Sequence, residues 1–320
     1  MTYSAGSLIL ASDYNTFATN TNAFWATGSG NLGWGQTSLS SVSTSGVVTA
    51  TNWASLVNNL ATASNHTGVS ITSRTAPVTG NTIAILNNLA TDITNITASA
   101  SSATGIGSQQ ANWTGTTSKT TATGSGTTAW TITFTHTITW ASAAAQRYFF
   151  NGGGLLKWQV SKTADSTDAD TEWNDLAGTL CGAIYLSGTG AAKSIGGTSY
   201  NGTTKVGGTG TPNILTTGTG AYDLTGSPTT LYQQYADTSP YTGQYITLAA
   251  TNSGSAITFT TTWTDPGGSG AGSSDNISGG TATTGATFGT APATLVTVYP
   301  PSTTYLANSW GTVSVAASVV

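Results

Sequence analysis

Residues 130–140 read WTITFTHTITW, with threonine at every odd position from 131 to 139 and bulky side chains at the even positions. Successive side chains of a β-strand point to opposite faces, so this stretch predicts a strand with one buried face and one hydroxyl face. Residues 256–264, AITFTTTWT, repeat the pattern. The second part of the chain is therefore predicted to be built from paired strands.

Further strands are predicted where short apolar runs stand between glycine-rich turns. These runs cover residues 155–160, 183–186, 245–249, 293–299 and 311–315. Residues 188–226 are rich in glycine and poor in apolar side chains, which indicates long loops or weak edge hairpins. Many short strands joined by such turns are typical of an antiparallel sandwich or barrel. We predict a mainly antiparallel β-sandwich over residues 129–320.

The N-terminal residues 1–97 instead show helical periodicity. Apolar side chains recur at three- and four-residue spacing, which is typical of amphipathic helices. Three helices are predicted, the first after a cap at Ser12 or Asp13, the second after Thr51 or Asn52, and the third from about Asn81 to Thr97.

Residues 98–128 separate the two parts. They consist almost entirely of Ser, Thr, Gly, Ala and Gln, a composition that predicts a linker or an extended loop. The predicted fold class is therefore α+β, with a small helical docking or assembly unit, a linker and a β-sandwich with long glycine-rich loops.

Charged side chains are scarce. The 320 residues include seven Lys and Arg and eleven Asp and Glu, about 6% of the chain, where soluble domains usually carry roughly a quarter. The basic residues are scattered singly, so no patch can neutralise the phosphates of a nucleic acid. No run of residues approaches the ~20 apolar residues of a membrane helix. We expect neither nucleic acid nor membrane as a partner.

The cysteine content and the N-terminus bear on where the protein acts. Cys181 is the only cysteine, so neither a disulfide framework nor a thiolate metal cluster is expected. Residues 1–11 contain no Lys or Arg and only a short apolar run, so no standard secretory signal is expected. Virus particles, assembled in the host cytoplasm and released by lysis, combine these properties with an uncharged surface. A dedicated secretion system is the other route.

Two glycine-rich stretches resemble phosphate-binding loops. Gly28 to Gly33 match G-x-G-x-x-G, but a predicted helix precedes the match where a dinucleotide site needs a strand. In residues 188–194, Ala192 stands where a phosphate loop needs glycine. Both interpretations as nucleotide sites are rejected, and no cofactor is predicted.

Hydrolytic chemistry has few candidate residues. The chain lacks G-x-S-x-G, and only His66 and His136 can act as a histidine base. We interpret His136 as a core residue on the apolar face of its strand and His66 as a capping residue near a helix end. Catalytic residues are therefore not predicted, and the protein is not expected to be an enzyme.

The densest acidic cluster runs from Asp165 to Glu172, with Asp175 beyond it. Carboxylates at every second or third position can converge on Ca²⁺, although the glycine and distal glutamate of a helix-loop-helix site are missing. Acidic residues before Trp173 also favour the start of a helix. We favour a solvated loop and helix start, predict no metal site, and leave Ca²⁺ binding open as an alternative.

Two regions resemble a recurrent type of tailed-phage virion protein, seen most often among marine and cyanobacterial phages. The two regions together span about half of the chain, and the matching stretches within them are Ala11–Asn15, Gly33–Gln36, Val48–Leu56, Gln146–Leu155, Tyr232–Tyr235 and Tyr241–Ile246. Proteins of this type are described as structural parts of the particle. The resemblance implies a structural role without fixing a position on the head, neck, tail or fibre.

We therefore predict a non-enzymatic structural protein of a tailed-phage virion, located in the tail, neck, fibre or head decoration. It is expected to form homo-oligomers, trimeric or of higher symmetry, and to dock on other virion proteins through its N-terminal helices. Their aromatic side chains exceed what a small helical unit needs, which predicts that some are buried against a partner, namely Phe17, Phe24, Trp25 or Trp53.

Two alternatives belong to other classes. A carbohydrate-binding adhesin or receptor-binding protein would stack host surface glycans on exposed rings, with Tyr200, Tyr222 and Trp173 as candidates, and would use Ca²⁺ in the acidic loop. An enzyme that degrades surface polysaccharide would need Glu172, the only glutamate, as one of two catalytic carboxylates.

Overall fold

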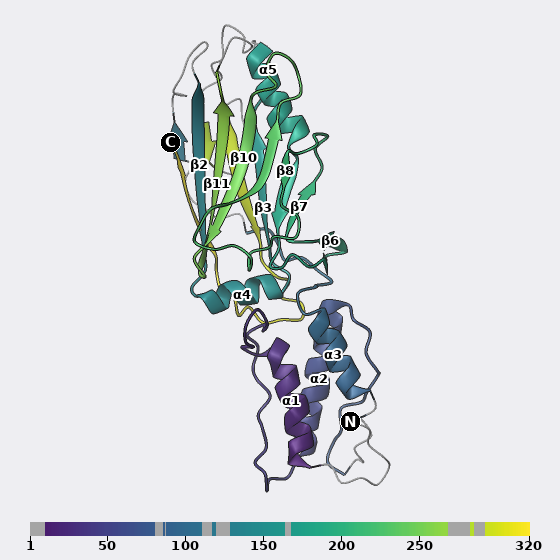
Figure 1. Ribbon diagram of the computed structural model, residues 1–320. Coiled ribbons are helices and arrows are strands. Elements are labelled where there is room, and N and C mark those ends of the chain that lie inside the picture. Colours follow the sequence, from purple (N-terminus) through teal and green to yellow (C-terminus); the bar gives the residue numbers. More distant parts are fainter. Residues whose placement is uncertain are drawn as a thin grey trace.

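The described part of the chain forms five α-helices, one π-helix, two six-stranded sheets and a two-stranded sheet (Figure 1). The computed structural model describes residues 10–80, 86, 88–110, 117–119, 129–163, 168–267, 282–284 and 292–320. The N-terminal helices are α1 (Ala11–Trp25), α2 (Ala50–Thr67) and α3 (Leu89–Ala98). We call residues 10–98 the helical unit and residues 129–320 the β unit. The predicted α+β fold class is confirmed.

The first two helices begin at local capping interactions. In α2, Thr49 Oγ1 accepts a hydrogen bond from Asn52 N at 3.3 Å, and Asn52 Oδ1 accepts one from Thr49 N at 2.9 Å. The α1 helix starts after Leu10, whose N–H donates to the Asp13 carboxylate at 2.8 Å. Asp13 therefore closes the first turn from inside the helix, and the predicted cap at Ser12 or Asp13 is wrong.

The third helix is shorter than predicted. It begins at Leu89, directly after Asn88, whose φ of 55° is incompatible with continuous helix. Residues 81–85 and 87 lie outside the described residues. Arg74 forms a buried salt bridge with Asp92 of α3, and Asp92 also accepts from Thr72 N at 3.1 Å. This pair fixes the chain segment after α2 against α3.

The aromatic side chains of α1 and α2 fill the core of the helical unit itself. Phe17, Phe24, Trp25 and Trp53 are all buried, so the prediction that some face a partner is wrong. The reason is that an extended segment runs back along α1 and covers it. Asn15 and Asn22 of α1 hold this segment, donating to Val42 O at 2.8 Å and Leu39 O at 2.9 Å.

The β unit contains two sheets that pack face to face as a sandwich. In spatial order, the first sheet comprises β1 (Thr117–Lys119), β12 (Ala282–Thr284), β13 (Ala293–Tyr299), β3 (Leu155–Ser161), β4 (Ala183–Leu186) and β7 (Thr203–Val206). The second comprises β14 (Ser314–Val319), β2 (Trp130–Thr139), β11 (Ala256–Asp265), β10 (Tyr245–Asn252), β9 (Thr229–Tyr235) and β8 (Ile214–Leu215). A separate hairpin is formed by β5 (Lys193–Ile195) and β6 (Thr198–Tyr200). Every pairing is antiparallel except that of β12 with β13.

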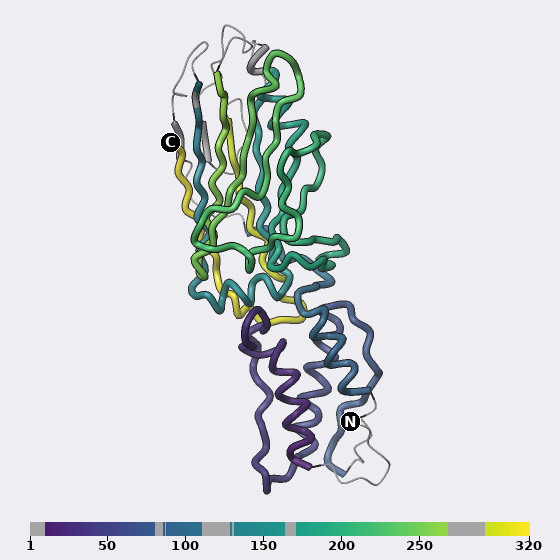
Figure 2. Tube along the Cα trace, in the orientation of Figure 1, coloured from purple at the N-terminus to yellow at the C-terminus, as the bar shows by residue number. Residues whose placement is uncertain are grey.

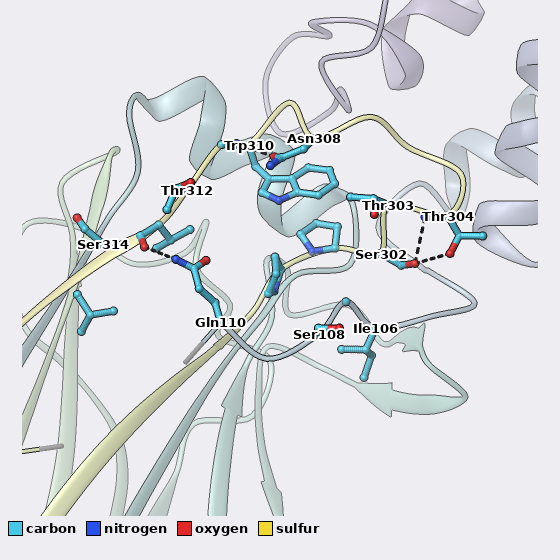
Figure 3. Close-up of a pocket in the computed structure, with 16 residues that line it drawn as sticks. Ile106, Ser108, Gln110, Ser302, Thr303, Thr304, Asn308, Trp310, Thr312 and Ser314 are labelled. Carbon is cyan, nitrogen blue, oxygen red and sulfur yellow. Dashed lines mark hydrogen bonds between the residues drawn. The ribbon is translucent and has the colours of Figure 1, made fainter. Parts of the chain in front are cut away.

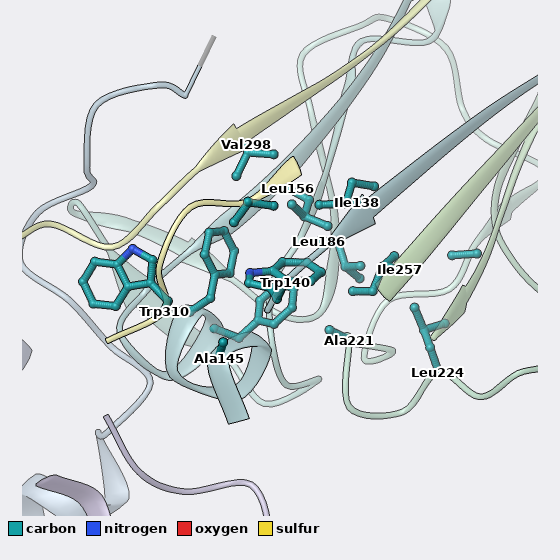
Figure 4. Packing of buried hydrophobic residues seen from close by; sticks show 14 of the residues in the cluster. Ile138, Trp140, Ala145, Leu156, Leu186, Ala221, Leu224, Ile257, Val298 and Trp310 are labelled. Carbon is teal, nitrogen blue, oxygen red and sulfur yellow. The ribbon is translucent and has the colours of Figure 1, made fainter. Parts of the chain in front are cut away.

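The two alternating stretches pair with each other, as their common pattern favours. In β2 and β11, Ile138 stands opposite Ile257, and Thr137 stands opposite Thr258 with their hydroxyl oxygens 3.2 Å apart. The apolar rows face the other sheet. Figure 4 shows this core near α4, with Ile138 and Ile257 from one sheet and Leu156 and Val298 from the other.

A short helix, α4 (Ala143–Asn151), crosses the end of the sandwich and was not predicted. Ser142 Oγ caps it by accepting from Ala145 N at 3.1 Å. Because α4 carries the chain from one sheet to the other, β3 pairs with β13 and β4. The strand that starts at Leu155 therefore belongs to the first sheet and does not pair with residues 130–140.

Other boundaries also differ from the prediction. The last strand begins at Ser314 rather than at 311, while residues 188–226 contain short strands, as expected for weak edge hairpins.

The α5 helix (Asp168–Asn174) and the π-helix η1 (Asp175–Leu180) lie beside the sheets. In Figure 1, α5 lies at the end of the β unit farthest from the helical unit, which we call the distal tip. In the described part of the chain, no helix is both long and apolar enough to cross a membrane.

The predicted linker is partly bound to the β unit. Ala103 pairs with Ile195, and Gln110 pairs with Val298. Residues 111–116 and 120–128 lie outside the described residues, and Thr117–Lys119 form β1. One connected cluster of buried apolar side chains extends from Tyr14 to Val313. The helical and β units therefore share a continuous core.

Candidate functional site at the interdomain junction

The helical unit and the β unit meet end to end, with α4 between them (Figure 2). The contact is made by the Gly33–Gln36 turn, the Arg147–Gly153 segment and residues 307–310 near the C-terminus. We call these three segments the junction. Two of them belong to the stretches that resemble virion proteins, and they are far apart in the sequence.

Trp34 is the central side chain of the junction. Its indole is fully buried and lies 5.3 Å from the ring of Phe24 and 5.0 Å from that of His66, measured between centroids. Its Nε1–H donates to Ala100 O at 2.8 Å and to Asn151 O at 3.0 Å. Trp34 therefore joins the core of the helical unit to both the linker and α4.

Asn151 at the end of α4 contacts the same turn from the other side. Its Nδ2 donates to Gly33 O at 3.0 Å, and its Oδ1 accepts from Tyr222 Oη at 2.9 Å. The side chain is buried, so these hydrogen bonds are made away from bulk water. A buried amide with both ends bonded fixes the position of its neighbours more firmly than an apolar contact does.

Arg147 and Gln36 close the junction at its edges. The guanidinium of Arg147 donates to Thr27 O at 2.6 Å and to Gly30 O at 3.4 Å, and its carbon lies 5.3 Å from the Tyr148 ring centroid. Gln36 donates to Ala307 O at 3.0 Å and accepts from Ala307 N at 2.9 Å. Both of these polar side chains therefore bond to backbone groups.

The turn requires glycine at its closest approach to α4. Gly35 has a φ of +68°, and a Cβ there would stand 2.5 Å from Cδ2 of Tyr148. No side chain larger than hydrogen fits this position without movement of the tyrosine ring. The resemblance stretch Gly33–Gln36 thus has a geometric role that its spacing did not reveal.

An open groove of about 820 Å³ lies beside the junction (Figure 3). Its walls come from residues 106–110, 300–304 and 308–315, and hydroxyl, amide and proline side chains dominate them. Gln110 spans the groove and donates to Val313 O at 2.5 Å. Among the described residues that line the groove, none carries a carboxylate or an imidazole.

The two histidines lie apart in the core. His66 packs against Trp34 and His136 lies within β2, and burial lowers the pKa of each to about 4. The expectation that His136 is a core residue is confirmed. The capping interpretation of His66 is wrong, because its ring is buried and Gly68, with a φ of 76°, ends the helix. Burial also raises the pKa of Cys181 to about 12, so this thiol stays protonated at neutral pH.

The acidic cluster is divided by the structure. Asp165 lies outside the described residues, as do the side chains of Asp168 and Asp170. Glu172 is buried on α5, and one of its oxygens lies within 4.8 Å of carboxylate oxygens of Asp175 and Asp237. Asp237 comes from the loop between β9 and β10, and no pattern in the sequence indicates that this loop reaches α5.

The rings named for glycan stacking are not displayed at the surface. Trp173 and Tyr200 are buried, and Tyr222 is half-buried with its hydroxyl bonded to Asn151. Trp173 stacks on Trp263 at a centroid distance of 5.5 Å. The expectation that these three rings are exposed is therefore wrong.

Comparison with protein-family models, curated proteins and solved structures finds no significant match to this chain.

Proposed function

We propose that the protein is a non-enzymatic structural component of a tailed-phage virion, which docks on the particle through its helical unit and presents its β unit to solvent. The observation that carries the proposal is the junction. Two stretches that resemble virion proteins, Gly33–Gln36 and Arg147–Gly153, bond to each other there and join two units through one core. An elongated protein whose two units share one core is suited to a structural role in a particle.

The surface chemistry supports the same role. With 6% charged residues, copies of the chain can pack around a symmetry axis with little repulsion. The two histidines and the cysteine are buried, which leaves them poorly placed for chemistry on a substrate. The protein would be located in the virion, which is assembled in the host cytoplasm and becomes extracellular after lysis.

The docking end is inferred from the direction of the helices. His66, near the C-terminus of α2, contacts Trp34 at the junction, so the N-terminus of α2 points away from the β unit. Val47 lies just before α2 and is 82% exposed, and Leu10 lies just before α1 and is 51% exposed. Large apolar side chains so exposed are suited to burial against a partner.

The proposal is tested by measuring assembly. Native mass spectrometry of the purified chain is expected to show a closed homo-oligomer, and antibodies against the chain are expected to label one region of the phage particle in electron micrographs. In particles that carry Val47→Asp, labelling is expected to fall, whereas Val206→Asp, a control on β7 at a side chain 43% exposed, should leave it unchanged. A strictly monomeric chain that labels no particle would refute the proposal.

A further inference from the structure

Three carboxylates from two separate chain segments meet at the distal tip. Glu172 lies on α5, Asp175 begins η1, and Asp237 lies in the loop that joins β9 to β10. Glu172 and Asp175 are three residues apart, which places them on the same side of a helix. Their ligand oxygens and that of Asp237 all lie within 4.8 Å of one another.

The burial of Glu172 makes this group different from an ordinary acidic surface. Glu172 is only 5% exposed, and its Oε1 is buried without a hydrogen-bond partner. Leaving a buried charged oxygen unsatisfied costs more free energy than leaving a neutral polar group unsatisfied. The buried carboxylate of Glu172 thus has an oxygen that a bound cation or a proton can satisfy.

The charges around Glu172 indicate the sign of that ligand. The carboxylates of Asp175 and Asp237 each place a ligand oxygen within 4.8 Å of that of Glu172, and both repel its charged form. Among the described residues, the charged groups that act on Glu172 are thus negative. A cation placed among the three oxygens would offset this repulsion.

We propose that Glu172, Asp175 and Asp237 form a Ca²⁺ site that ties α5 and η1 to the β9–β10 loop. The donor set is entirely oxygen, as Ca²⁺ prefers, and water can complete its six to eight ligands. Two oxygens bound to one ion at 2.3–2.6 Å are at most about 5 Å apart, which accommodates the 4.8 Å limit. Mg²⁺ demands near-ideal octahedral geometry at about 2.0–2.1 Å and gives up its water reluctantly, so three protein carboxylates from two chain segments suit Ca²⁺ better.

The site is independent of the proposed virion role, because it concerns the end of the β unit opposite the helices. It differs from the acidic run in the sequence, since Asp237 enters from another loop. A π-helix begins at Asp175, and such helical irregularities are frequent at functional sites. Binding would fix the loop after β9 against α5 and so stiffen the distal tip.

The test uses the full chain, stripped with chelator and titrated with CaCl₂ by isothermal titration calorimetry. One site is expected, with a dissociation constant in the range of about 10⁻⁴–10⁻³ M that is typical of extracellular modules. Tb³⁺ is expected to occupy the same site and to luminesce on excitation of Trp173, which adjoins Glu172 in sequence. MgCl₂ is expected to bind at least tenfold more weakly.

Variants separate a cation from a proton as the group that satisfies Glu172. Asp175→Asn and Asp237→Asn are each expected to weaken Ca²⁺ binding at least tenfold, and the control Asp223→Asn, in the loop of Tyr222, should leave it unchanged. Glu172→Gln is expected to abolish the rise of Tm on Ca²⁺ addition while raising Tm in chelator. Absence of Ca²⁺ binding to the parent chain, or equal binding by Asp237→Asn, would overturn the proposal and leave Glu172 satisfied by protonation.

Discussion

The β unit ends in two different ways. At the junction, Trp34, Gln36 and Asn151 bond to neutral partners that are mostly backbone carbonyls. At the distal tip, three carboxylates converge, and one oxygen of Glu172 has no hydrogen-bond partner. The polar side-chain groups of Trp34, Gln36 and Asn151 are thus bonded within the chain, whereas Oε1 of Glu172 can be satisfied by an ion or a proton from solution. The comparison indicates that hydrogen bonds within the chain hold the junction, whereas the state of the distal tip depends on the ions and the pH of the solution.

Tryptophan substitutions give the largest expected contrast between the two ends. Trp34→Ala is expected to lower the free energy of unfolding by about 3–5 kcal/mol, since it removes a fully buried ring. It also leaves Ala100 O and Asn151 O without their donor. Because the core is continuous through Trp34, urea unfolding of this variant is expected to split into two transitions where the parent shows one.

A milder pair of variants isolates the hydrogen bonds. Trp34→Phe keeps an aromatic ring but loses both bonds, while Trp263→Phe, near the tip, loses none because its Nε1 has no partner in the described structure. We expect the first to cost about 1–3 kcal/mol more than the second. Equal losses would show that packing alone holds the junction.

Acid titration is expected to change the free energy of unfolding in opposite directions through the two buried histidines and through Glu172 at the distal tip. Burial lowers the pKa of His66 and His136 to about 4, whereas unfolded histidine titrates near 6.5. Between these values the unfolded chain binds protons that the native chain does not, so stability falls as pH falls from about 6.5 to 4. The loss is expected to reach about 3 kcal/mol per histidine, and it stops below the native pKa.

Single variants assign this dependence to its sources. His66→Gln and His136→Gln are each expected to remove about half of the loss, measured as the unfolding free energy in urea across this pH range. Glu172 has the opposite sign, because its raised pKa makes the native chain retain a proton that the unfolded chain releases as pH rises. In chelator, Glu172→Gln should therefore steepen the gain of stability with rising pH. An unchanged profile in all three variants would contradict the assignment.

A glycine pair measures how tightly the junction is packed. Gly35 and Gly30 both have positive φ, but of the two only Gly35 would bring a Cβ against side chains, those of Tyr148 and Ser309. Alanine at either position costs the backbone strain of a left-handed residue, about 1–2 kcal/mol. Gly35→Ala is expected to cost a further ~1–3 kcal/mol from overpacking. Chemical denaturation of both variants checks the difference, and equal costs would mean that Tyr148 moves aside freely.

The sequence was informative where one strand carries its own pattern. The alternation of residues 130–140 and 256–264 predicts β2 and β11 because a period of two depends only on neighbours along the chain. The strands at 183–186 and 293–299 have the predicted bounds because their short apolar runs stand between turn residues, which are also local signals. Helix α4 was missed because its nine residues are too few for a clear period and a glycine run follows them.

The junction and the tip were not predictable in the same way. Trp34 donates to backbone carbonyls 66 and 117 residues away, and a carbonyl accepts in the same manner whichever residue carries it. Asp237 reaches Glu172 only because the sandwich brings the β9–β10 loop beside α5. Contacts that depend on tertiary topology leave no residue-type signal in a single sequence.

Arg147 gives the smallest expected effect and the clearest test of salt sensitivity. Arg147→Lys keeps the charge but lacks the planar guanidinium whose two nitrogens donate to Thr27 O and Gly30 O. We expect it to lower the free energy of unfolding by about 1 kcal/mol. Because both acceptors are neutral, this loss should be the same at low and high NaCl, as measured by urea denaturation. Ca²⁺ affinity at the tip should instead fall as salt screens the carboxylates. If the Arg147→Lys loss shrinks in high salt, charge contributes to the junction, and the two ends differ less in their chemistry than the hydrogen bonds indicate.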